Sequence, residues 1–333
     1  MGEFQRFING IGRSLYRNRE TIAKWTARIT LVLALPLAAI ALFPIILQTI
    51  APTISNTEDL YSVNRPVAFT FLDSGGNEVG HRGAIVGKRL KLEDMPAYLP
   101  AAFIAMEDRR FYSHNGIDMR GLMRAMYTNF RAGHVVAGGS TITQQTAKIV
   151  YTSQERTMAR KLSELMDAAS LEKSLSKKEI LELYLNRIYL GAGAYGVDGA
   201  AHVYFGKSAK DLTLPEAAML ATLTRAPSVF TPRRDLARAQ ERAQIVLRTM
   251  YASDFITRAD AEEAMAHPAV ITDRTATDSR NYFFDTAADE ARTLLTKDGQ
   301  SLNADLVVHT TLEPKIQEAA RSAAVRTIRK RGR

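Results

Sequence analysis

An uncharged, apolar segment near the N-terminus constrains this chain more than any other feature. Residues 29–57 contain no charged side chain, and the stretch ITLVLALPLAAIALFPIIL within them is apolar over about the 20 residues that cross a bilayer as a helix. Pro36 and Pro44 are tolerated in membrane helices, where neighbouring groups satisfy the backbone atoms that proline frees. A cleaved signal peptide is the alternative, but the apolar run and the 28 residues before it are both too long for one. We therefore predict a transmembrane helix over residues 29–50.

The charges beside this span predict its orientation. Before it stand six basic and two acidic residues: Arg6, Arg13, Arg17, Arg19, Lys24 and Arg28, with Glu3 and Glu20. The positive-inside rule then places residues 1–28 in the cytoplasm and the chain after Ala51 outside. We expect a single-pass protein of the cytoplasmic (inner) membrane with a periplasmic domain. The net charge of +9 favours an anionic partner, and a domain held beside lipid argues against nucleic acid.

The exterior region has the pattern of a mainly α domain flanked by short β segments. Residues 65–83 alternate apolar side chains and turn at residues 74–77, as a β-hairpin does. From residue 96 to about residue 267 the helical period dominates, and residues 304–315 have the pattern of one strand leading into a helix. Because an isolated strand needs a partner, we expect this strand to pair with the hairpin in a small sheet.

A pair of carboxylates ends the first helix of this domain. In AFIAMEDRRFYSHNG, residues 102–116, an apolar run leads into Glu107 and Asp108. Desolvation at the edge of an apolar helix disfavours the charged form of a carboxylate, which is how a general acid or base is poised near neutral pH. The alternative is a surface acidic pair that offsets Arg109 and Arg110.

A second carboxylate shares a helix face with two arginines. In QERTMARKLSELMDAASLEK, residues 154–173, the apolar residues form one stripe. At about 100° per residue, Arg156, Arg160 and Glu164 fall together on the opposite side. The alternative is a solvated ladder of i, i+4 ion pairs, each worth about 0.3–0.5 kcal/mol.

Between these two segments lies a run of hydroxyl, amide and ammonium groups. Residues 138–148 are GGSTITQQTAK, a glycine pair followed by nine residues of which seven are Ser, Thr, Gln or Lys. Fixed donors of these kinds stabilise negative charge that grows in a transition state. A turn that caps the next helix is the alternative, and it is compatible with binding, because Ser140 can do both.

Read together, these segments resemble glycosyltransferase family 51, the peptidoglycan polymerase domain of class A penicillin-binding proteins and monofunctional transglycosylases. The segments that carry the resemblance are EDRRFYSHNG, GGSTITQQTAK, RKLSE and KKEILELYLNRIYLGAGAYG, within a region from about residue 66 to residue 250. The resemblance implies a mainly α, lysozyme-like transglycosylase domain with an N-terminal transmembrane helix and a small β-hairpin and linker sheet. The implied parts are a cytoplasmic tail (1–28), the span (29–50), a linker with the hairpin (51–90), the transglycosylase domain (91–255) and a linker toward a transpeptidase domain (256–333).

The resemblance also implies the reaction. Such a domain polymerises lipid II into β-1,4-linked glycan strands with inversion and release of undecaprenyl pyrophosphate. Inversion calls for a base at the acceptor hydroxyl and for help to the leaving group on the opposite face. By motif position, Glu107 is then the base and Glu164 the second carboxylate, near the pyrophosphate. The substrate-binding residues implied by the motifs are Asp108, Phe111, His114, Ser140, Thr141, Thr143, Gln144, Gln145, Lys148, Arg156 and Arg160.

Cations are expected around the pyrophosphate. An anionic Glu164 beside phosphates is repulsive unless an ammonium, guanidinium groups, a divalent cation or a raised pKa offsets it, and Lys148, Arg156 and Arg160 supply the first two. No cofactor is required, and a divalent cation, Mg²⁺ or Mn²⁺, at the pyrophosphate stays open. The six histidines have no metal-ligand spacing, so no metal site is predicted, and His114 is expected to hold the loop that carries Glu107.

The helix expected between the first two motifs suits a membrane surface. Residues 117–136 place Met and other apolar side chains at helical spacing, with Arg120, Arg124 and Arg131 alongside. A buried core helix is the alternative. The partners implied are lipid II, the growing glycan strand, the cell membrane, inhibitors of the moenomycin type and other wall-synthesis proteins.

Some positions depart from the family pattern. Ile149 follows Lys148 where the family often has Asn, and Arg242 is followed by Ala243 where the family has paired arginines. We expect the helix that carries Arg242 to be scaffold. SLEK and SLSK at residues 170–177 match the transpeptidase pattern S-x-x-K, but K-T-G does not occur, so no transpeptidase activity is expected from this chain.

Two other functions stay open at this point. A lysozyme-like enzyme that cleaves glycan would share the fold and a catalytic Glu, but it would not need Lys148, Arg156 and Arg160. A non-catalytic scaffold of the wall-synthesis machinery would not need the intact motif residues.

Overall fold

The computed structural model describes residues 19–63, 67–134, 138–151, 158–272, 281–297 and 305–331. The chain forms two compact units, divided between Ala51 and Pro52. The first unit contains helix α2 (Arg19–Ile50), so the predicted helix is present and begins earlier than expected. Within the described residues, no helix is both long and apolar enough to cross a membrane. The membrane span at residues 29–50 therefore stays a prediction.

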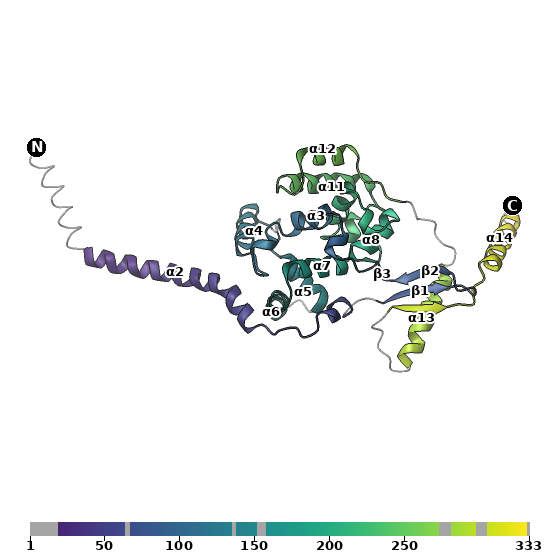
Figure 1. The fold of residues 1–333 in the computed structure, drawn as a ribbon, viewed down its shortest axis with the longest axis horizontal. Helices are drawn as coiled ribbons and strands as arrows, with labels where there is room; N and C mark the ends of the chain where they lie inside the picture. Colours follow the sequence, from purple (N-terminus) through teal and green to yellow (C-terminus); the bar gives the residue numbers. More distant parts are fainter. Residues whose placement is uncertain are drawn as a thin grey trace, which may run out of the picture. The chain divides into compact units, whose positions relative to one another are not determined.

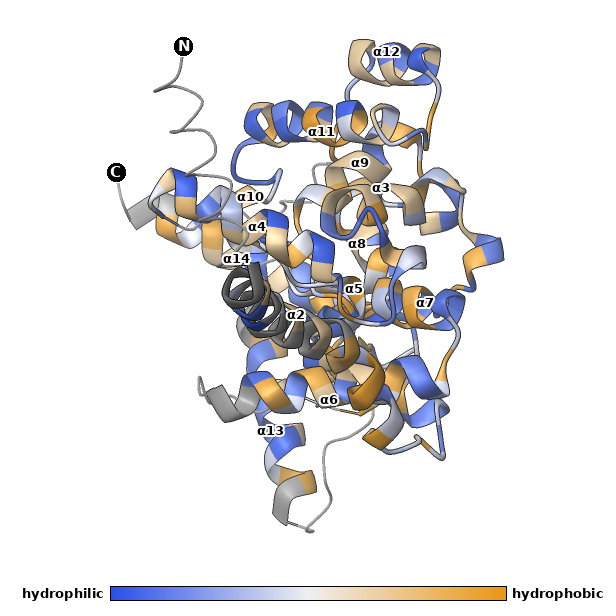
Figure 2. Cartoon of the chain, turned by 90° about the vertical axis from the view of Figure 1, so that its left-hand side faces the viewer, coloured by the Kyte–Doolittle hydropathy of each residue, from blue (hydrophilic) through white to orange (hydrophobic). Residues whose placement is uncertain are grey.

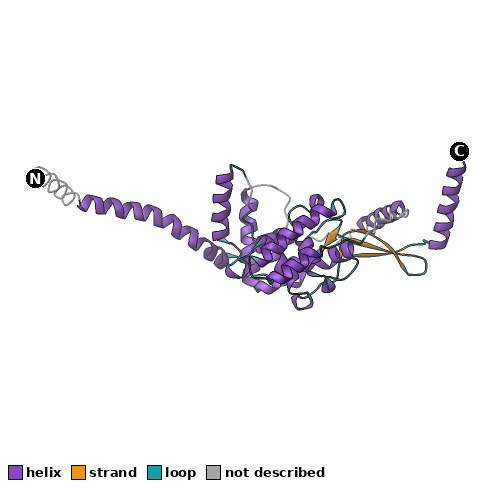
Figure 3. Cartoon of the chain, turned by 90° about the horizontal axis from the view of Figure 1, so that it is seen from above, coloured by secondary structure: helices purple, strands orange, loops and turns teal. Residues whose placement is uncertain are grey.

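The second unit is mainly helical, and its strands form two small sheets (Figure 3). Its longer elements are β1 (Ala68–Leu72), β2 (Glu78–Gly83), α3 (Tyr98–Glu107), α4 (Met119–Ala132), α5 (Ile142–Tyr151), α6 (Met158–Ser174), α7 (Lys177–Arg187), α8 (Gly196–Phe205), α9 (Leu214–Thr222), α11 (Leu236–Tyr251), α12 (Arg258–Ala266), α13 (Asn281–Lys297), β5 (Leu306–His309) and α14 (Pro314–Arg331). The shorter ones are η1 (Glu58–Tyr61), β3 (Ile85–Val86), η2 (Leu92–Asp94), η3 (Phe111–Ser113), β4 (Ala194–Tyr195), η4 (Ala209–Asp211) and α10 (Pro227–Phe230). The predicted mainly α fold is confirmed, whereas the finer division at residues 90 and 255 stays a prediction.

Helix α9 is at the centre of the helical core. It packs against both α3 and α11 (Figure 2). Residues 217–222 are all buried, and three of them are alanines, whose small side chains let neighbouring helices approach closely. A capping box of Thr213 and Glu216 starts the helix by satisfying free backbone N–H groups at its first turn. The core therefore holds the last residue of α3, Glu107, against the segment that follows α9.

The two ends of the second unit meet in a three-stranded sheet of order β2-β1-β5 (Figure 1). Strand β1 is antiparallel to β2 and parallel to β5, with Phe69 opposite Leu306. This pairing confirms the sheet predicted from the hairpin and the late strand. Helix α13, which the sequence did not predict, covers the sheet, and its Phe284 stacks on Phe71 with ring centroids 4.9 Å apart.

Candidate active site

A cavity of about 360 Å³ lies at the C-terminal end of α3, between α4 and the loop that precedes α5. Glu107, the last residue of α3, and Asp108, which follows it, line one side of the cavity. Residues 138–141 line another side, and they begin the segment GGSTITQQTAK, residues 138–148, which we call the polar run. Its walls also hold four arginines: Arg109, Arg110, Arg124 and Arg225. Three carboxylates share the walls, those of Glu107, Asp108 and Asp118, and Asp118 lies 3.4 Å from Arg110. The walls thus carry one more positive than negative charge, which suits an anionic substrate rather than a cationic one.

The carboxylate of Glu107 is held at both oxygens. Thr224 Oγ1 donates to Glu107 Oε1 over 2.6 Å, and Gln145 Nε2 donates to Oε2 over 2.8 Å. Arg225 Nε lies 3.8 Å from Oε1, and the Glu107 side chain is only 8% exposed. The last residue of a buried helix thus keeps one orientation at the cavity wall.

A buried phenol holds the amide of Gln145. The Tyr184 hydroxyl donates to Gln145 Oε1 over 3.1 Å. Burial, and then the charge of Glu107, raise the pKa of Tyr184 well above its ordinary value of 10. The phenol therefore stays protonated at physiological pH and donates, so Gln145 directs its carbonyl to Tyr184 and its NH₂ group to Glu107.

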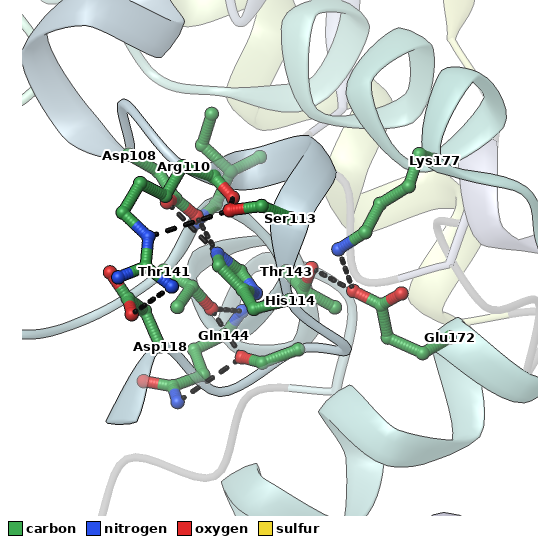
Figure 4. A network of polar contacts seen from close by, with 12 residues as sticks. Asp108, Arg110, Ser113, His114, Asp118, Thr141, Thr143, Gln144, Glu172 and Lys177 are labelled. Carbon is green, nitrogen blue, oxygen red and sulfur yellow. Dashed lines mark hydrogen bonds and ion pairs between the residues drawn. The ribbon is translucent and has the colours of Figure 1, made fainter. Parts of the chain in front are cut away.

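Asp108 ties the first motif to the polar run (Figure 4). His114 Nε2 lies 3.0 Å from both of its carboxylate oxygens, and the backbone N–H of Ile142 donates to Oδ2 over 3.1 Å. The carboxylate thereby occupies the N-terminus of α5, where it also meets the positive end of the helix dipole. His114 is buried and packs edge-on against Phe111.

Much of the polar run faces the interior. Thr141 Oγ1 and Gln144 Nε2 both donate to the carbonyl of Gly116, over 2.6 and 3.4 Å. Thr143 Oγ1 donates to Glu172 Oε1 over 2.5 Å. These three side chains are buried, and each has an acceptor within the protein (Figure 4). Their predicted contact with substrate stays untested, and the contacts that the structure records are structural.

Glu172 in turn forms an ion pair with a half-buried lysine. Lys177 Nζ donates to Glu172 Oε1 over 2.6 Å, and it lies 4.4 Å from the ring centroid of Phe111. Helices α5, α6 and α7 are joined here through one carboxylate. The ring of Phe111 is fully buried, so it anchors this part of the first motif in the core rather than in the cavity.

The structure divides the predicted site residues into two sets. Glu107, Asp108, Ser140 and Thr141 line the cavity, and Gln145 reaches it through Glu107. Phe111, His114, Thr143 and Gln144 lie outside the cavity wall.

The second predicted carboxylate is on helix α6. Glu164 is 10% exposed at its side chain and accepts a hydrogen bond of 2.6 Å from Lys161 Nζ. Burial, and then the charge of Glu164, raise the pKa of Asp167 on the same helix. Arg156 and the side chain of Arg160 lie outside the described residues, and Lys148 is exposed at the end of α5.

In the described part of the chain, no three His, Asp or Glu side chains lie close enough together to bind a metal ion. Residues 152–157, which include Arg156 of the predicted pyrophosphate site, lie outside that part. A divalent cation at the pyrophosphate stays a prediction.

Three contacts of the site have no signal in the sequence pattern. Thr224 and Arg225 lie in a loop after α9, 117 and 118 positions from Glu107. Tyr184 is one of several apolar or aromatic residues of α7 and looks like an ordinary core residue. Thr224 and Arg225 lie in the segment LTRAPS, residues 223–228, which follows the four motifs. No role was predicted for this segment, so nothing pointed to these two residues.

Helix α4 forms one exposed wall beside the cavity. Of its side chains only Ala125 is buried, while Met123, Met126, Tyr127 and Phe130 are 57%, 60%, 62% and 87% exposed. The alternative of a buried core helix is therefore wrong. An exposed apolar face beside arginines is the pattern of a helix in a membrane interface.

Similarity to known proteins covers the same part of the chain. The family described as Transglycosylase matches residues 77–251. Penicillin-binding protein 1A of Aquifex aeolicus is 41% identical over 249 residues, which are 74% of this chain and 34% of that protein. Penicillin-binding protein 1A of Vibrio cholerae is 41% identical over 242 residues, which are 72% of this chain and 29% of that protein.

A solved structure matches as well. The crystal structure of penicillin-binding protein 1A from Haemophilus influenzae aligns with 78% of this chain and 29% of that chain, at 26% identity and a TM-score of 0.47. The chain spans about a third of the length of the curated relatives named above. Because the Transglycosylase match covers more than half of the 333 residues, the chain belongs to the transglycosylase family, glycosyltransferase family 51.

Proposed function

We propose that this chain polymerises lipid II into β-1,4-linked glycan strands, with inversion and release of undecaprenyl pyrophosphate. The observation that carries the proposal is the setting of Glu107. Its carboxylate has one neutral donor on each oxygen and stands in the wall of a cavity with four arginines. Membership of the transglycosylase family supports the reaction class.

Glu107 acts as the base in this proposal. It takes the proton of the acceptor's 4-hydroxyl, whose oxygen attacks C1 of the donor sugar on the face opposite to the pyrophosphate. Each carboxylate oxygen accepts more than one hydrogen bond, so the bonds from Thr224 and Gln145 leave room for a substrate hydroxyl. A base that is already oriented loses little freedom when the reacting groups meet.

The leaving pyrophosphate is assigned to three cations that the motifs supply. Lys148, Arg156 and Arg160 offset its growing charge, with Ser140 as a further donor, and Glu164 is the second carboxylate. Lys161 already offsets part of the charge of Glu164. Mg²⁺ or Mn²⁺ would supply the same compensation at this place. Moenomycin, whose phosphate mimics that of the donor, would bind here.

The membrane brings substrate and enzyme together. Lipid II is held in the bilayer by its prenyl chain, so its phosphates lie at headgroup height. The exposed apolar face of α4 beside the cavity would enter the interface at that height. With residues 29–50 as an anchor, the domain would work at the periplasmic side of the cytoplasmic membrane, with the growing strand and other wall-synthesis proteins as neighbours.

A polymerisation assay tests the proposal. The full chain is incubated with labelled lipid II and, separately, with finished glycan, and the products are separated on a gel. We expect polymer from lipid II and no change in finished glycan. Cleavage of finished glycan would support the lysozyme-like alternative, and consumption of neither would support a scaffold.

A further inference from the structure

A second cavity, of about 1160 Å³, lies between helix α12 and the first turns of α3 and α9. We call it the α12 groove. It shares no lining residue with the cavity that holds Glu107. Its lining is mainly apolar and includes Ala97, Ala101, Leu214, Phe255, Ile256 and Ala264. A groove of this volume has room for several side chains of a binding partner.

Small side chains leave the α12 groove unfilled. Helix α12 packs mainly on α11 (Figure 1), and its buried residues are Ala261 and Ala264, which have no atoms beyond Cβ to fill the space. Phe255 and Ile256, in the turn between α11 and α12, are half-buried beside it. Because protein interiors are close-packed, an apolar space that stays open at the surface is typical of an interaction site.

The rim of the groove is acidic. Asp254, Asp260 and Glu263 line it and are exposed, and of the described residues no lysine or arginine lines it. A histidine, His267, also lines it and lies 3.3 Å from Glu263. The whole chain has a net charge of +9, so the charge of this rim is opposite in sign to that of the protein. Such a rim attracts basic groups and repels lipid phosphates.

We propose that the α12 groove binds a basic segment of a partner protein. A large apolar side chain of this segment enters the groove, and its lysine or arginine side chains pair with Asp254, Asp260 and Glu263. Charge complementarity favours such a segment over an acidic one and over an anionic lipid. An apolar anchor in a pocket, with polar groups around it, is the usual anatomy of a protein–protein interface. A bound partner leaves the cavity of Glu107 open, because the two share no lining residue.

Peptide selection tests the proposal. The full chain, in a nonionic detergent, is the bait for a library of random dodecapeptides displayed on phage. We expect the selected peptides to carry lysine or arginine residues around a large apolar residue. Their dissociation constants are then measured by fluorescence anisotropy for the wild type and for variants of the groove. Polymerisation plays no part in this measurement, so its result is valid even if the proposed function fails.

The variants separate the rim from the apolar lining. Asp254→Asn combined with Glu263→Gln removes two rim charges, and Asn tolerates the positive φ of 58° at residue 254. Asp260 stays, because it caps the first turn of α12. We expect the double variant to bind the peptides about three- to tenfold more weakly. Ile256→Ser, which removes an apolar lining group, should weaken binding about tenfold. Glu241→Gln, at an exposed glutamate of α11 outside the groove, is the matched control and should bind as wild type does.

Several results would overturn the proposal. Three of them are acidic selected peptides, peptides that bind all variants equally, and a library that yields no binder. Self-association of the chain in sedimentation equilibrium, if the double variant abolishes it, would assign the groove to a second copy. Binding of a short-chain phosphatidylglycerol that Ile256→Ser abolishes, with no peptide bound, would assign it to lipid. Should Ile256→Ser unfold at a lower temperature than wild type, the double variant carries the test, because both of its residues are exposed.

Discussion

Thr224 donates a hydrogen bond of 2.6 Å to Glu107 across 117 positions of sequence. The bond joins the end of α3 to the loop after α9, two helices that pack together in the core. Gln145 holds the other carboxylate oxygen from α5. The orientation of the proposed base is therefore a property of the packed core rather than of the end of α3 alone.

Replacement of the base should abolish polymerisation and leave the fold intact. Glu107→Gln keeps the size of the side chain and removes the proton acceptor, so turnover should fall by about 10²–10⁴-fold or more, as is typical of a lost general base. The hydroxyl of Thr224 can turn to accept from the new amide, so the melting temperature should change little. Turnover is read from the lipid II gel assay, and wild-type rates in this variant would sink the assignment.

Removal of the Tyr184 hydroxyl should reduce turnover through Gln145. Tyr184→Phe leaves the half-buried Gln145 carbonyl without its donor, a loss of about 1 kcal/mol in the free energy of unfolding. The freed amide can rotate away from Glu107, so kcat should fall more than KM rises. Tyr251→Phe, at a 46% exposed tyrosine, is the control. A stability loss with unchanged kcat would mean that Tyr184 acts in packing alone.

Alkaline pH should destabilise the fold through Tyr61. Burial, with the charge of Glu182, raises the pKa of Tyr61 to about 12. The folded state thus holds this proton more tightly than the unfolded state, where the pKa is 10. The resulting stability is complete below pH 10 and is lost as the pH rises toward 12. Thermal unfolding at pH 9 and pH 11.5 measures this loss, which Tyr61→Phe should make smaller. An identical loss in that variant would contradict the assignment.

Exposed side chains of α4 should control binding to lipid. In a shortened chain that starts at Pro52, Phe130→Asp should weaken partition into vesicles about ten- to a hundred-fold, because the transfer of one phenylalanine is worth about 1.5–3 kcal/mol. Its melting temperature should stay the same, since Phe130 is 87% exposed. Co-sedimentation with vesicles gives the partition coefficient. Equal partition of the two proteins would remove α4 from the interface.

Loss of the Lys148 charge should weaken the donor site. For Lys148→Ala we expect moenomycin affinity and use of the donor to fall roughly ten- to a hundred-fold, as for a lost charge-assisted hydrogen bond of about 1.5–3 kcal/mol. The KM for acceptor lipid II should stay near wild type. Lys173→Ala, at the end of α6, is a charge-matched control. Unchanged moenomycin affinity in Lys148→Ala would place the ammonium away from the donor.

The sequence alone determined most of the local elements, helix α13 excepted, and the family. Helical and alternating periods are properties of neighbouring residues, so the mainly α region and the hairpin of β1 and β2 could be predicted. The pairing of β5 with this hairpin could also be predicted, because the hairpin was the only predicted β segment with which a single late strand could pair. The family also followed, because four motifs in order are specific by themselves.

Only the tertiary structure decided which polar groups of the motifs face the cavity. In GGSTITQQTAK the period cannot separate the two faces of α5, because polar residues lie on both. Thr143 and Gln144 turn inward because Glu172 and the carbonyl of Gly116 accept from them there, whereas Gln145 turns to Glu107 because Tyr184 holds its carbonyl. Each of these acceptors and donors comes from a distant segment, and a hydrogen bond inside a core is fixed by the atoms that packing brings within reach, which no local pattern contains.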